Sequence, residues 1–261
     1  MLKRVISALI AVPILLIVMY LGGIFFTLGI GFLIYLGLIE YHTMLEKSGL
    51  KPLKALNYCA AAAVIIAAYL GNLQLLTIII ILFFIILFIF LIFNYTKHDL
   101  KDLFYTFSGL VYVAFLFSYL IIIRLHLHKG LMFLILIIAC VWVNDSAAYF
   151  VGSYLGKNKL CPEISPNKTV EGSVGGIIGA LIVAFIGGLI LDFNFIHSLV
   201  IGLVTGILGQ FGDLAESILK RYFKIKDSGN FMPGHGGVLD RFDSILFTVP
   251  LLYYYLLLFM N

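Results

Sequence analysis

Long apolar stretches separated by short polar ones run through the whole chain. A membrane-spanning helix needs about 20 mostly apolar residues. The stretches that satisfy or approach this length are residues 5–21, 24–41, 56–71, 75–94, 104–123, 131–151, 172–191, 195–214 and 243–260. An open sheet in lipid would leave backbone groups unpaired, so each stretch is predicted to be a helix. The pattern predicts an all-α polytopic integral membrane protein with about nine transmembrane helices.

Composition supports this class. The chain has 261 residues, of which 62% are hydrophobic and 11% are charged, whereas a soluble domain carries about 25% charged residues. Lys3 and Arg4 precede an apolar run, as at the start of a signal peptide. The run continues to Tyr41 with a break only at Gly22 and Gly23, so an uncleaved first span is expected.

The basic residues predict a topology. With nine spans and a cytoplasmic N-terminus, only Arg124 and Lys129 of the 17 lysines and arginines lie outside, as the positive-inside rule requires. The loops 152–171 and 215–242 then face the cytoplasm. This predicts a multi-pass protein of a bacterial-type inner (cell) membrane, in which any site built on these two loops faces the cytoplasm. We divide the chain into N-terminal transmembrane helices (1–55), middle transmembrane helices (56–130) and a C-terminal catalytic transmembrane region (131–261).

Small residues recur at spacings of three and four in two of the predicted helices. They are Gly172, Gly175, Gly176, Gly179 and Ala180 in the first, and Gly202, Gly206 and Gly209 in the second. This spacing is typical of closely packed membrane helices. A nucleotide-binding glycine loop would need a preceding strand and a βαβ unit, which the pattern does not predict. Close helix packing is therefore the favoured interpretation.

The segment from Glu216 to Asp243 concentrates charge between two apolar spans. Dense charge beside a bilayer is costly and usually functional. On a continuing helix, Asp213, Glu216 and Lys220 would form one polar stripe. A solvated helix face with ion pairs explains Glu216 and Lys220 well. It explains Asp213 less well, because Asp213 directly follows a glycine-rich apolar span.

A Pro-Gly-His-Gly-Gly turn follows, and then the acids that open the last span. Asp240 and Asp243 share one helix face, where the helix dipole alone would favour them. Converging carboxylates of Asp213, Asp240 and Asp243 would equally suit Mg²⁺, which prefers hard oxygen ligands. Lys220, Arg221 and Arg241 would supply phosphate contacts. His235 in the turn is equally well explained by a structural or a catalytic role.

Two further polar segments are candidates. Asn144 and Asp145 lie within or near the end of an apolar span. An Asp beside an Asn there indicates a polar cavity, or Asp145 is a buried, hydrogen-bonded structural acid. The segment Ser165 to Glu171, which includes Lys168 and Thr169, precedes a glycine-rich helix. Thr169 could help bind an anion there or simply cap the helix.

At these segments the chain resembles the phosphatidate cytidylyltransferases, or CDP-diacylglycerol synthases. The residues that match the long family motif are Ser217, Lys220, Arg221, Lys226, Asp227, Gly229, Pro233, Gly234, His235, Gly236, Gly237, Asp240, Arg241 and Asp243. Shorter matches start at Asn144, Ser165 and Gly212. Many members have lysine where this chain has Asn167. The similarity is strongest from about residue 140 to the end.

The resemblance implies a Mg²⁺-dependent nucleotidyltransferase of phospholipid biosynthesis. It implies that CTP and phosphatidate give CDP-diacylglycerol and pyrophosphate, that the enzyme is a homodimer, and that no nucleic acid is bound. The identity of a second cation is left open. By the resemblance, Asp213 and Asp240 match metal-binding acids, while Lys220, Arg221 and Arg241 match phosphate-contacting positions. The candidate substrate-binding residues are Asn144, Asp145, Ser165, Lys168, Thr169, Glu171, Glu216, Ser217, Lys226 and Asp227.

The chemistry agrees with the residue types. The oxygen of a lipid phosphate can attack phosphorus itself, so alignment and charge neutralisation suffice, without an activated side-chain nucleophile. A CTP-using enzyme acting on another lipid, such as archaeol phosphate or a polyprenol, remains an alternative. An ion transporter would need polar groups spread through the membrane and an inverted repeat. A non-catalytic lipid-binding scaffold would not require the cluster of carboxylates and arginines.

Overall fold

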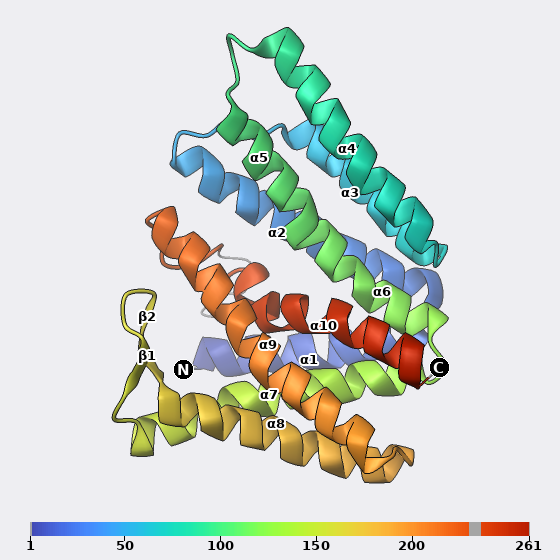
Figure 1. The fold of residues 1–261 in the computed structure, drawn as a ribbon, viewed down its shortest axis with the longest axis vertical. Helices are drawn as coiled ribbons and strands as arrows, with labels where there is room; N and C mark the ends of the chain where they lie inside the picture. Colours follow the sequence, from blue (N-terminus) through green and yellow to red (C-terminus); the bar gives the residue numbers. More distant parts are fainter. Residues whose placement is uncertain (1, 230–235, 261) are drawn as a thin grey trace. The chain divides into compact units, whose positions relative to one another are not determined.

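The computed structural model describes residues 2–229 and 236–260, with residues 2–11 as backbone only. Helices make up most of it (Figure 1). Those of the first half are α1 (Leu2–Leu21), α2 (Gly23–Lys47), α3 (Lys54–Tyr69), α4 (Leu73–Asn94), α5 (Leu100–Gly109), the π-helical η1 (Leu110–Phe115) and α6 (Leu116–His126). Those of the second half are α7 (Gly130–Leu155), α8 (Val170–Leu191), α9 (Phe195–Tyr222) and α10 (Leu239–Phe259).

Seven of the described helices are long and apolar enough to cross a membrane. They are α2, α4, the continuous Leu100–His126 helix formed by α5, η1 and α6, and then α7, α8, α9 and α10. Two shorter apolar helices, Val12–Leu21 within α1 and Lys54–Tyr69, account for the remaining predicted spans. The helical, polytopic membrane class is thus supported. The count of nine spans and the cytoplasmic N-terminus stay predictions.

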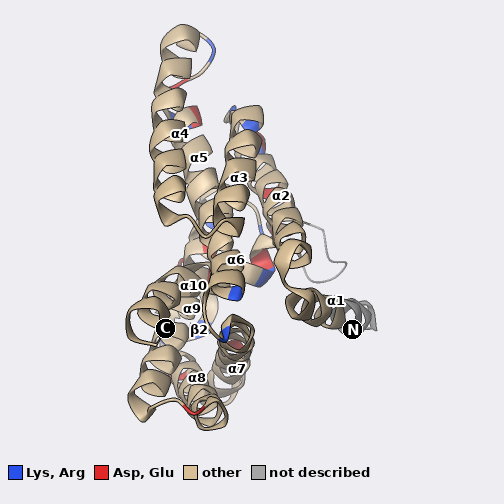
Figure 2. Ribbon diagram, turned by 90° about the vertical axis from the view of Figure 1, so that its right-hand side faces the viewer, with Lys and Arg blue, Asp and Glu red and all other residues tan. Residues whose placement is uncertain are grey.

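Charged residues interrupt these helices only briefly. Figure 2 shows Lys, Arg, Asp and Glu as short coloured segments on helices that are otherwise uncharged. The α4 helix carries no charged residue at all, and only four of its large apolar side chains are buried: Leu76, Phe83, Leu87 and Leu91. Exposed apolar side chains along a whole helix are expected where lipid replaces water.

A short β-hairpin stands where only a loop was predicted. The α7 helix ends at Leu155, and β1 (Lys159–Cys161) pairs antiparallel with β2 (Ser165–Thr169) before α8 begins. These strands are too short and too polar to show the alternation by which strands are predicted. The other predicted loop, 215–242, is also shorter than expected, because α9 continues to Tyr222 and α10 starts at Leu239.

The chain forms two compact units. Of the described residues, unit 1 comprises 2–126, 223–229 and 236–241, and unit 2 comprises 127–222 and 242–260. Within unit 1, α3 and α4 lie side by side (Figures 1 and 2). Within unit 2, α8 packs against both α7 and α9. The three-part division by helix groups stays a prediction.

The glycine-rich faces predicted for unit 2 pack as expected. A Cβ atom at Gly202 would lie 2.8 Å from the Cα of Leu181, and one at Gly206 would lie 3.0 Å from the Cα of Ile177. Neither glycine can therefore carry a side chain without separating α8 from α9. The packing interpretation of the small-residue pattern is confirmed.

Candidate active site

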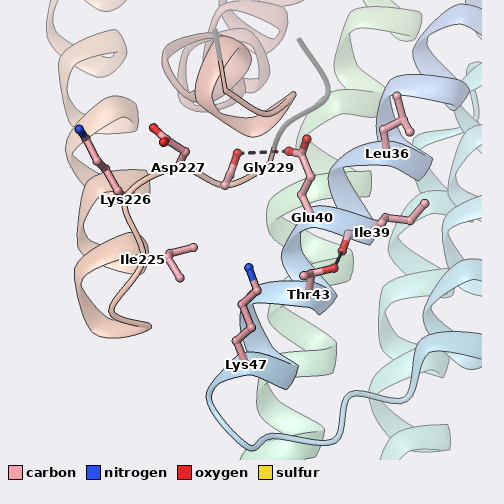
Figure 3. Close-up of a pocket in the computed structure, with 10 residues that line it drawn as sticks. Leu36, Ile39, Glu40, Thr43, Lys47, Ile225, Lys226, Asp227 and Gly229 are labelled. Carbon is pink, nitrogen blue, oxygen red and sulfur yellow. Dashed lines mark hydrogen bonds between the residues drawn. The ribbon is translucent and has the colours of Figure 1, made fainter. Parts of the chain in front are cut away.

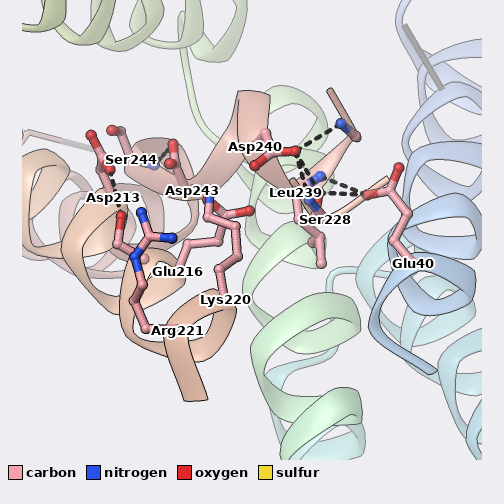
Figure 4. Close-up of polar contacts among 12 residues, drawn as sticks. Glu40, Asp213, Glu216, Lys220, Arg221, Ser228, Leu239, Asp240, Asp243 and Ser244 are labelled. Atoms are coloured by element: carbon pink, nitrogen blue, oxygen red, sulfur yellow. Dashed lines mark hydrogen bonds and ion pairs between the residues drawn. The ribbon is translucent and has the colours of Figure 1, made fainter. Parts of the chain in front are cut away.

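In unit 2, α9 and α10 approach closely at Gly212. A Cβ atom on Gly212 would lie 3.0 Å from the carbonyl carbon of Asp243 and 3.1 Å from the Cα of Ser244. The glycine thus allows backbone contact between the two helices. Asp213 follows Gly212 directly, and it is one of the charged groups that act on the Asp243 carboxylate. Two of the predicted metal-binding acids are therefore brought together by helix packing (Figure 4).

The α9 helix also holds the β-hairpin. Lys168 Nζ on β2 lies 2.7 Å from Asp213 Oδ2 in an ion pair, with both side chains partly exposed. Arg221 Nε donates a hydrogen bond of 3.2 Å to the backbone oxygen of Ile164, in the hairpin turn. Ser217 Oγ lies 3.4 Å from the other Asp213 oxygen. Acids and bases of the predicted site thus meet along one helix and the hairpin beside it.

Glu216 and Lys220 form the expected i,i+4 ion pair, at 2.5 Å. It does not lie on a solvated helix face, because the side chains are only 1% and 14% exposed. A buried ion pair is costly unless further hydrogen bonds support it. Lys220 also acts electrostatically on Asp243, so this cation lies next to the acid pair formed by Asp213 and Asp243.

A polar network lies among α7, α8 and α9. Gln210 Nε2 donates hydrogen bonds to Asn144 Oδ1 (3.1 Å) and to the backbone oxygen of Ser173 (2.9 Å). Ser173 Oγ donates to Gln210 Oε1, and Asn144 Nδ2 donates to Asp145 Oδ1 at 3.2 Å. Asn144 is fully buried and Asp145 is exposed. The network holds Asn144 and orients the Asp145 carboxylate, which is hydrogen-bonded, as expected of a structural acid, but is not buried.

Gln210 and Ser173, which hold Asn144 in this network, were not predicted from the sequence. The available signal was a glutamine within an otherwise apolar, glycine-rich span, two residues before Gly212. A polar side chain in such a span usually faces the interior of a helix bundle and finds a partner there.

The loop between α7 and α8 is held by its own side chains. Thr169 Oγ1 accepts a hydrogen bond of 3.1 Å from the Gly172 amide, which confirms the helix-capping interpretation. The Glu171 carboxylate accepts from the amides of Lys157 (3.1 Å) and Asn158 (3.2 Å), and from Asn158 Nδ2 (2.8 Å). Ser165 opens β2 opposite Cys161. These contacts fix the hairpin that presents Lys168.

Asp240 belongs to unit 1 and links Ser228, before the Pro-Gly-His-Gly-Gly turn, to Gly237, the last residue of that turn. Its Oδ2 accepts hydrogen bonds from the Ser228 amide (2.9 Å), Ser228 Oγ (2.8 Å) and the Gly237 amide (2.8 Å). The neighbouring Arg241 side chain is exposed. His235, the candidate in the turn itself, lies outside the described residues. A role for Asp240 in metal binding stays a prediction.

Glu40 is a further polar residue that the sequence analysis did not select. It lies on α2 in unit 1 and accepts hydrogen bonds from Val238, Leu239 and Ser228. An acid within an apolar span was the available signal, because intramembrane charge is costly and commonly functional.

Lys226 and Asp227 line an open cleft of about 630 Å³ in unit 1. Figure 3 shows this cleft between α2, which contributes Glu40, Thr43 and Lys47, and the segment that contains Ile225. Both polar and apolar side chains therefore border the space next to Lys226 and Asp227.

The described residues contain no group of three His, Cys, Asp or Glu side chains that could by itself hold a metal ion. Mg²⁺ does not require one, because it is commonly bound through one or two carboxylates together with waters and substrate phosphates. The neighbouring carboxylates of Asp213 and Asp243 supply donors of the kind this ion prefers. Their chemistry fits Mg²⁺ with a phosphate ligand.

Comparison with known proteins gives consistent matches. The model of the cytidylyltransferase family matches residues 2–259. Phosphatidate cytidylyltransferase from Bacillus subtilis is 52% identical over 151 residues, which cover 57% of this chain and 56% of that protein. The proteins of the same name from Synechocystis sp. and Staphylococcus saprophyticus are 34% and 36% identical, and the matches cover 98% and 95% of this chain and 96% of each relative.

Proposed function

Because the chain belongs to the cytidylyltransferase family, we propose that it transfers CMP from CTP to phosphatidate in phospholipid biosynthesis. The products are CDP-diacylglycerol and pyrophosphate. The observation that carries this proposal is the acid pair of Asp213 and Asp243, with Lys168 and Lys220 beside it. Such a site matches a reaction between two phosphate-bearing substrates.

The reaction does not require a side chain of the protein to act as the nucleophile. A phosphate oxygen of phosphatidate attacks the α-phosphorus of CTP, the bond from that phosphorus to the bridging oxygen of the β-phosphate breaks, and pyrophosphate leaves with the electron pair. Ionised phosphatidate requires no deprotonation by a side chain. Catalysis then rests on alignment and on neutralisation of the phosphate charge, which suits a site built from lysine, arginine and carboxylate groups.

Asp213 and Asp243 are the residues that we propose to hold Mg²⁺. The ion would neutralise phosphate charge and polarise the phosphorus–oxygen bonds. The resemblance also assigns Asp240 to the metal. Asp240 accepts three hydrogen bonds within unit 1, and its proposed contribution is to hold Ser228 and Gly237 in place.

We propose that the hairpin binds the nucleotide. Lys168 on β2 is anchored by Asp213 and is only partly exposed, so its ammonium group is held in place for a phosphate. Arg221 supports the hairpin turn through Ile164. Ser165 and Thr169 frame the strand that carries Lys168, and Asn144 orients Asp145 nearby along α7. Lys226 and Asp227 stay candidates for substrate contact in the unit 1 cleft.

The setting that we propose is a bacterial inner membrane, with the active site on the cytoplasmic side and a homodimer as the working form. The apolar helices support a membrane enzyme. The positive-inside pattern supports the orientation, and the family resemblance supports the dimer.

A turnover assay on the purified protein in mixed micelles tests the reaction. It follows label from CTP into chloroform-soluble lipid, omitting phosphatidate or Mg²⁺ in turn, with Asp243→Asn as the impaired variant. We expect incorporation only in the complete mixture, with pyrophosphate released in equal amount. Incorporation with a polyprenol or archaeol phosphate but not with phosphatidate would redirect the proposal to another lipid acceptor. Folded protein inactive with every acceptor would overturn it.

A further inference from the structure

Glu40 is a buried carboxylate in unit 1, far in sequence from the motif residues that it contacts. It lies near the C-terminal end of α2, and the residue is 7% exposed. Its hydrogen-bond partner Val238 is 198 positions away along the chain. A carboxylate buried in an apolar helix is costly unless it is fully hydrogen-bonded, so its partners indicate why it is there.

All three partners, Ser228, Val238 and Leu239, flank the Pro-Gly-His-Gly-Gly turn in the sequence. Glu40 Oε1 accepts a hydrogen bond of 2.8 Å from the Val238 amide, and Oε2 accepts one of 3.0 Å from the Leu239 amide. Ser228 Oγ lies 3.2 Å from Glu40 Oε2 and 2.8 Å from Asp240 Oδ2, so one hydroxyl links the two carboxylates. Figure 4 shows the Glu40 carboxylate directed at Leu239 and Ser228. Glu40 thus joins Ser228, before the turn, to the start of α10, after it.

The motif glycines supply a second, independent observation. A Cβ atom at Gly229 would lie 2.5 Å from Glu40 Oε1, and one at Gly237 would lie 2.5 Å from Glu40 Oε2. Real Cβ atoms do not approach other atoms so closely, and both oxygens are held by hydrogen bonds. The space left by the two glycines is therefore filled by the Glu40 carboxylate.

We propose that Glu40 is a positioning residue for the nucleotidyl transfer, an inference that rests on the proposed function. Its carboxylate fixes Ser228 and the first residues of α10, and through them it fixes the conformation of Asp240 and of the backbone next to Arg241. The proposed action of Glu40 is indirect, through its hydrogen bonds to these residues. A residue of the N-terminal helices thereby sets the geometry of the C-terminal motif.

The first test uses the purified, full-length Glu40→Gln variant. Glutamine retains one acceptor oxygen but places an NH₂ group where a second acceptor is needed, so a backbone amide loses its partner. Glu46→Gln is the matched control, because Glu46 lies on the same helix and its side chain is 48% exposed in a surface ion pair with Lys54. The measurements are kcat and KM for CTP, thermal unfolding, and hydrogen exchange of the peptides that cover residues 225–229 and 236–241.

For Glu40→Gln we expect kcat to fall about tenfold or more, at a temperature where the variant is fully folded, with a smaller change in KM for CTP. Exchange should rise in the two peptides and stay unchanged in α3 and α4. The control should match wild type in all measurements. A folded variant with wild-type kcat would overturn the proposal, as would a loss of activity that follows only the unfolded fraction with exchange raised throughout.

A rescue experiment separates positioning from general stability and does not depend on Glu40→Gln folding. Gly229→Ala alone should raise exchange and lower kcat, because its methyl group meets the carboxylate. Combined with Glu40→Ala, which removes that carboxylate, the added methyl should cost much less than it does in wild type. Fully additive effects would contradict the proposed contact. If wild type itself transfers no CMP, the exchange measurements still test the contact, so the two proposals fail in distinguishable ways.

Discussion

Gly212 on α9 packs directly against the backbone of Asp243 on α10. The next residue, Asp213, therefore stands beside Asp243 without any loop to place it. Rigid helices hold catalytic groups more tightly than loops do. Gly212 thus sets the short distance between the two helices, and this distance brings the carboxylate of Asp213 close to that of Asp243.

Gly212→Ala should consequently lower both stability and activity. The added methyl has no space against the Asp243 backbone, and overpacking of this kind costs about 1–3 kcal/mol. Any relaxation would separate Asp213 from Asp243 and reduce kcat. Thermal unfolding and CTP turnover measure the two effects.

Gly209→Ala is the control for this prediction, since Gly209 lies on the same helix. A Cβ atom there would meet its nearest neighbour, Ser244 Cβ, at an ordinary 3.6 Å. Its stability and turnover should stay close to those of wild type. Equal losses in both variants would show that the close contact at Gly212 has no special role.

The helices and the polar stripe could be predicted because their signals are local. Apolar length specifies a membrane helix, and three- and four-residue spacing brings Glu216 and Lys220 together on any helix. The pairing of Asp213 with Asp243 could also be predicted, because Asp213 lies at the end of one predicted span and Asp243 at the start of the next.

The contacts of Glu40 and of the hairpin could not be predicted in the same way. Glu40 meets partners almost 200 positions away, and no local periodicity encodes such a pairing. The hairpin depends on Glu171 holding the chain at Asn158 and on Lys168 meeting Asp213. These are tertiary contacts of individual side chains, and they override the weak strand propensity of a lysine- and asparagine-rich segment.

Removing either carboxylate of the acid pair should act on the metal requirement. Asp213→Asn and Asp243→Asn keep the size of the side chain but remove a negative charge. We expect each to reduce kcat by roughly a hundredfold or more and to raise the Mg²⁺ concentration needed for half-maximal rate. A Mg²⁺ titration of turnover is the measurement.

Asp192→Asn provides the matched control for the acid pair. Asp192 caps the end of α8 in a left-handed conformation (φ 60°), which asparagine also adopts readily. Its Mg²⁺ titration should match that of wild type. If Asp243→Asn showed an unchanged Mg²⁺ requirement with only a lower rate, Asp243 would be a structural acid and not a ligand.

Lys168→Ala should weaken nucleotide binding more than it weakens the fold. The ion pair with Asp213 is partly exposed, and such pairs contribute about 1 kcal/mol or less to stability, so unfolding should change little. Loss of a phosphate contact should instead raise KM for CTP about tenfold or more.

Lys159→Ala is the control for Lys168→Ala. It removes the same charge from the other strand of the hairpin and should leave KM for CTP unchanged. Equal KM values for the two variants would argue against the hairpin as the nucleotide site.

Glu171→Gln should show whether nucleotide binding depends on the conformation of the hairpin as well as on the charge of Lys168. The Glu171 carboxylate accepts from two backbone amides and from Asn158 Nδ2, and it has no contact with Lys168 or Asp213 among these bonds. Glutamine accepts through one oxygen only, so the connection from α7 to β1 should loosen, and exchange of the peptide containing Asn158 should rise. Lys168 would then be presented less rigidly, and KM for CTP should rise while the Mg²⁺ requirement stays at the wild-type value.

Glu163→Gln, in the hairpin turn, removes the same charge without touching these bonds and should behave as wild type. A faster exchange at Asn158 with unaltered KM would mean that nucleotide binding does not depend on the conformation of this loop.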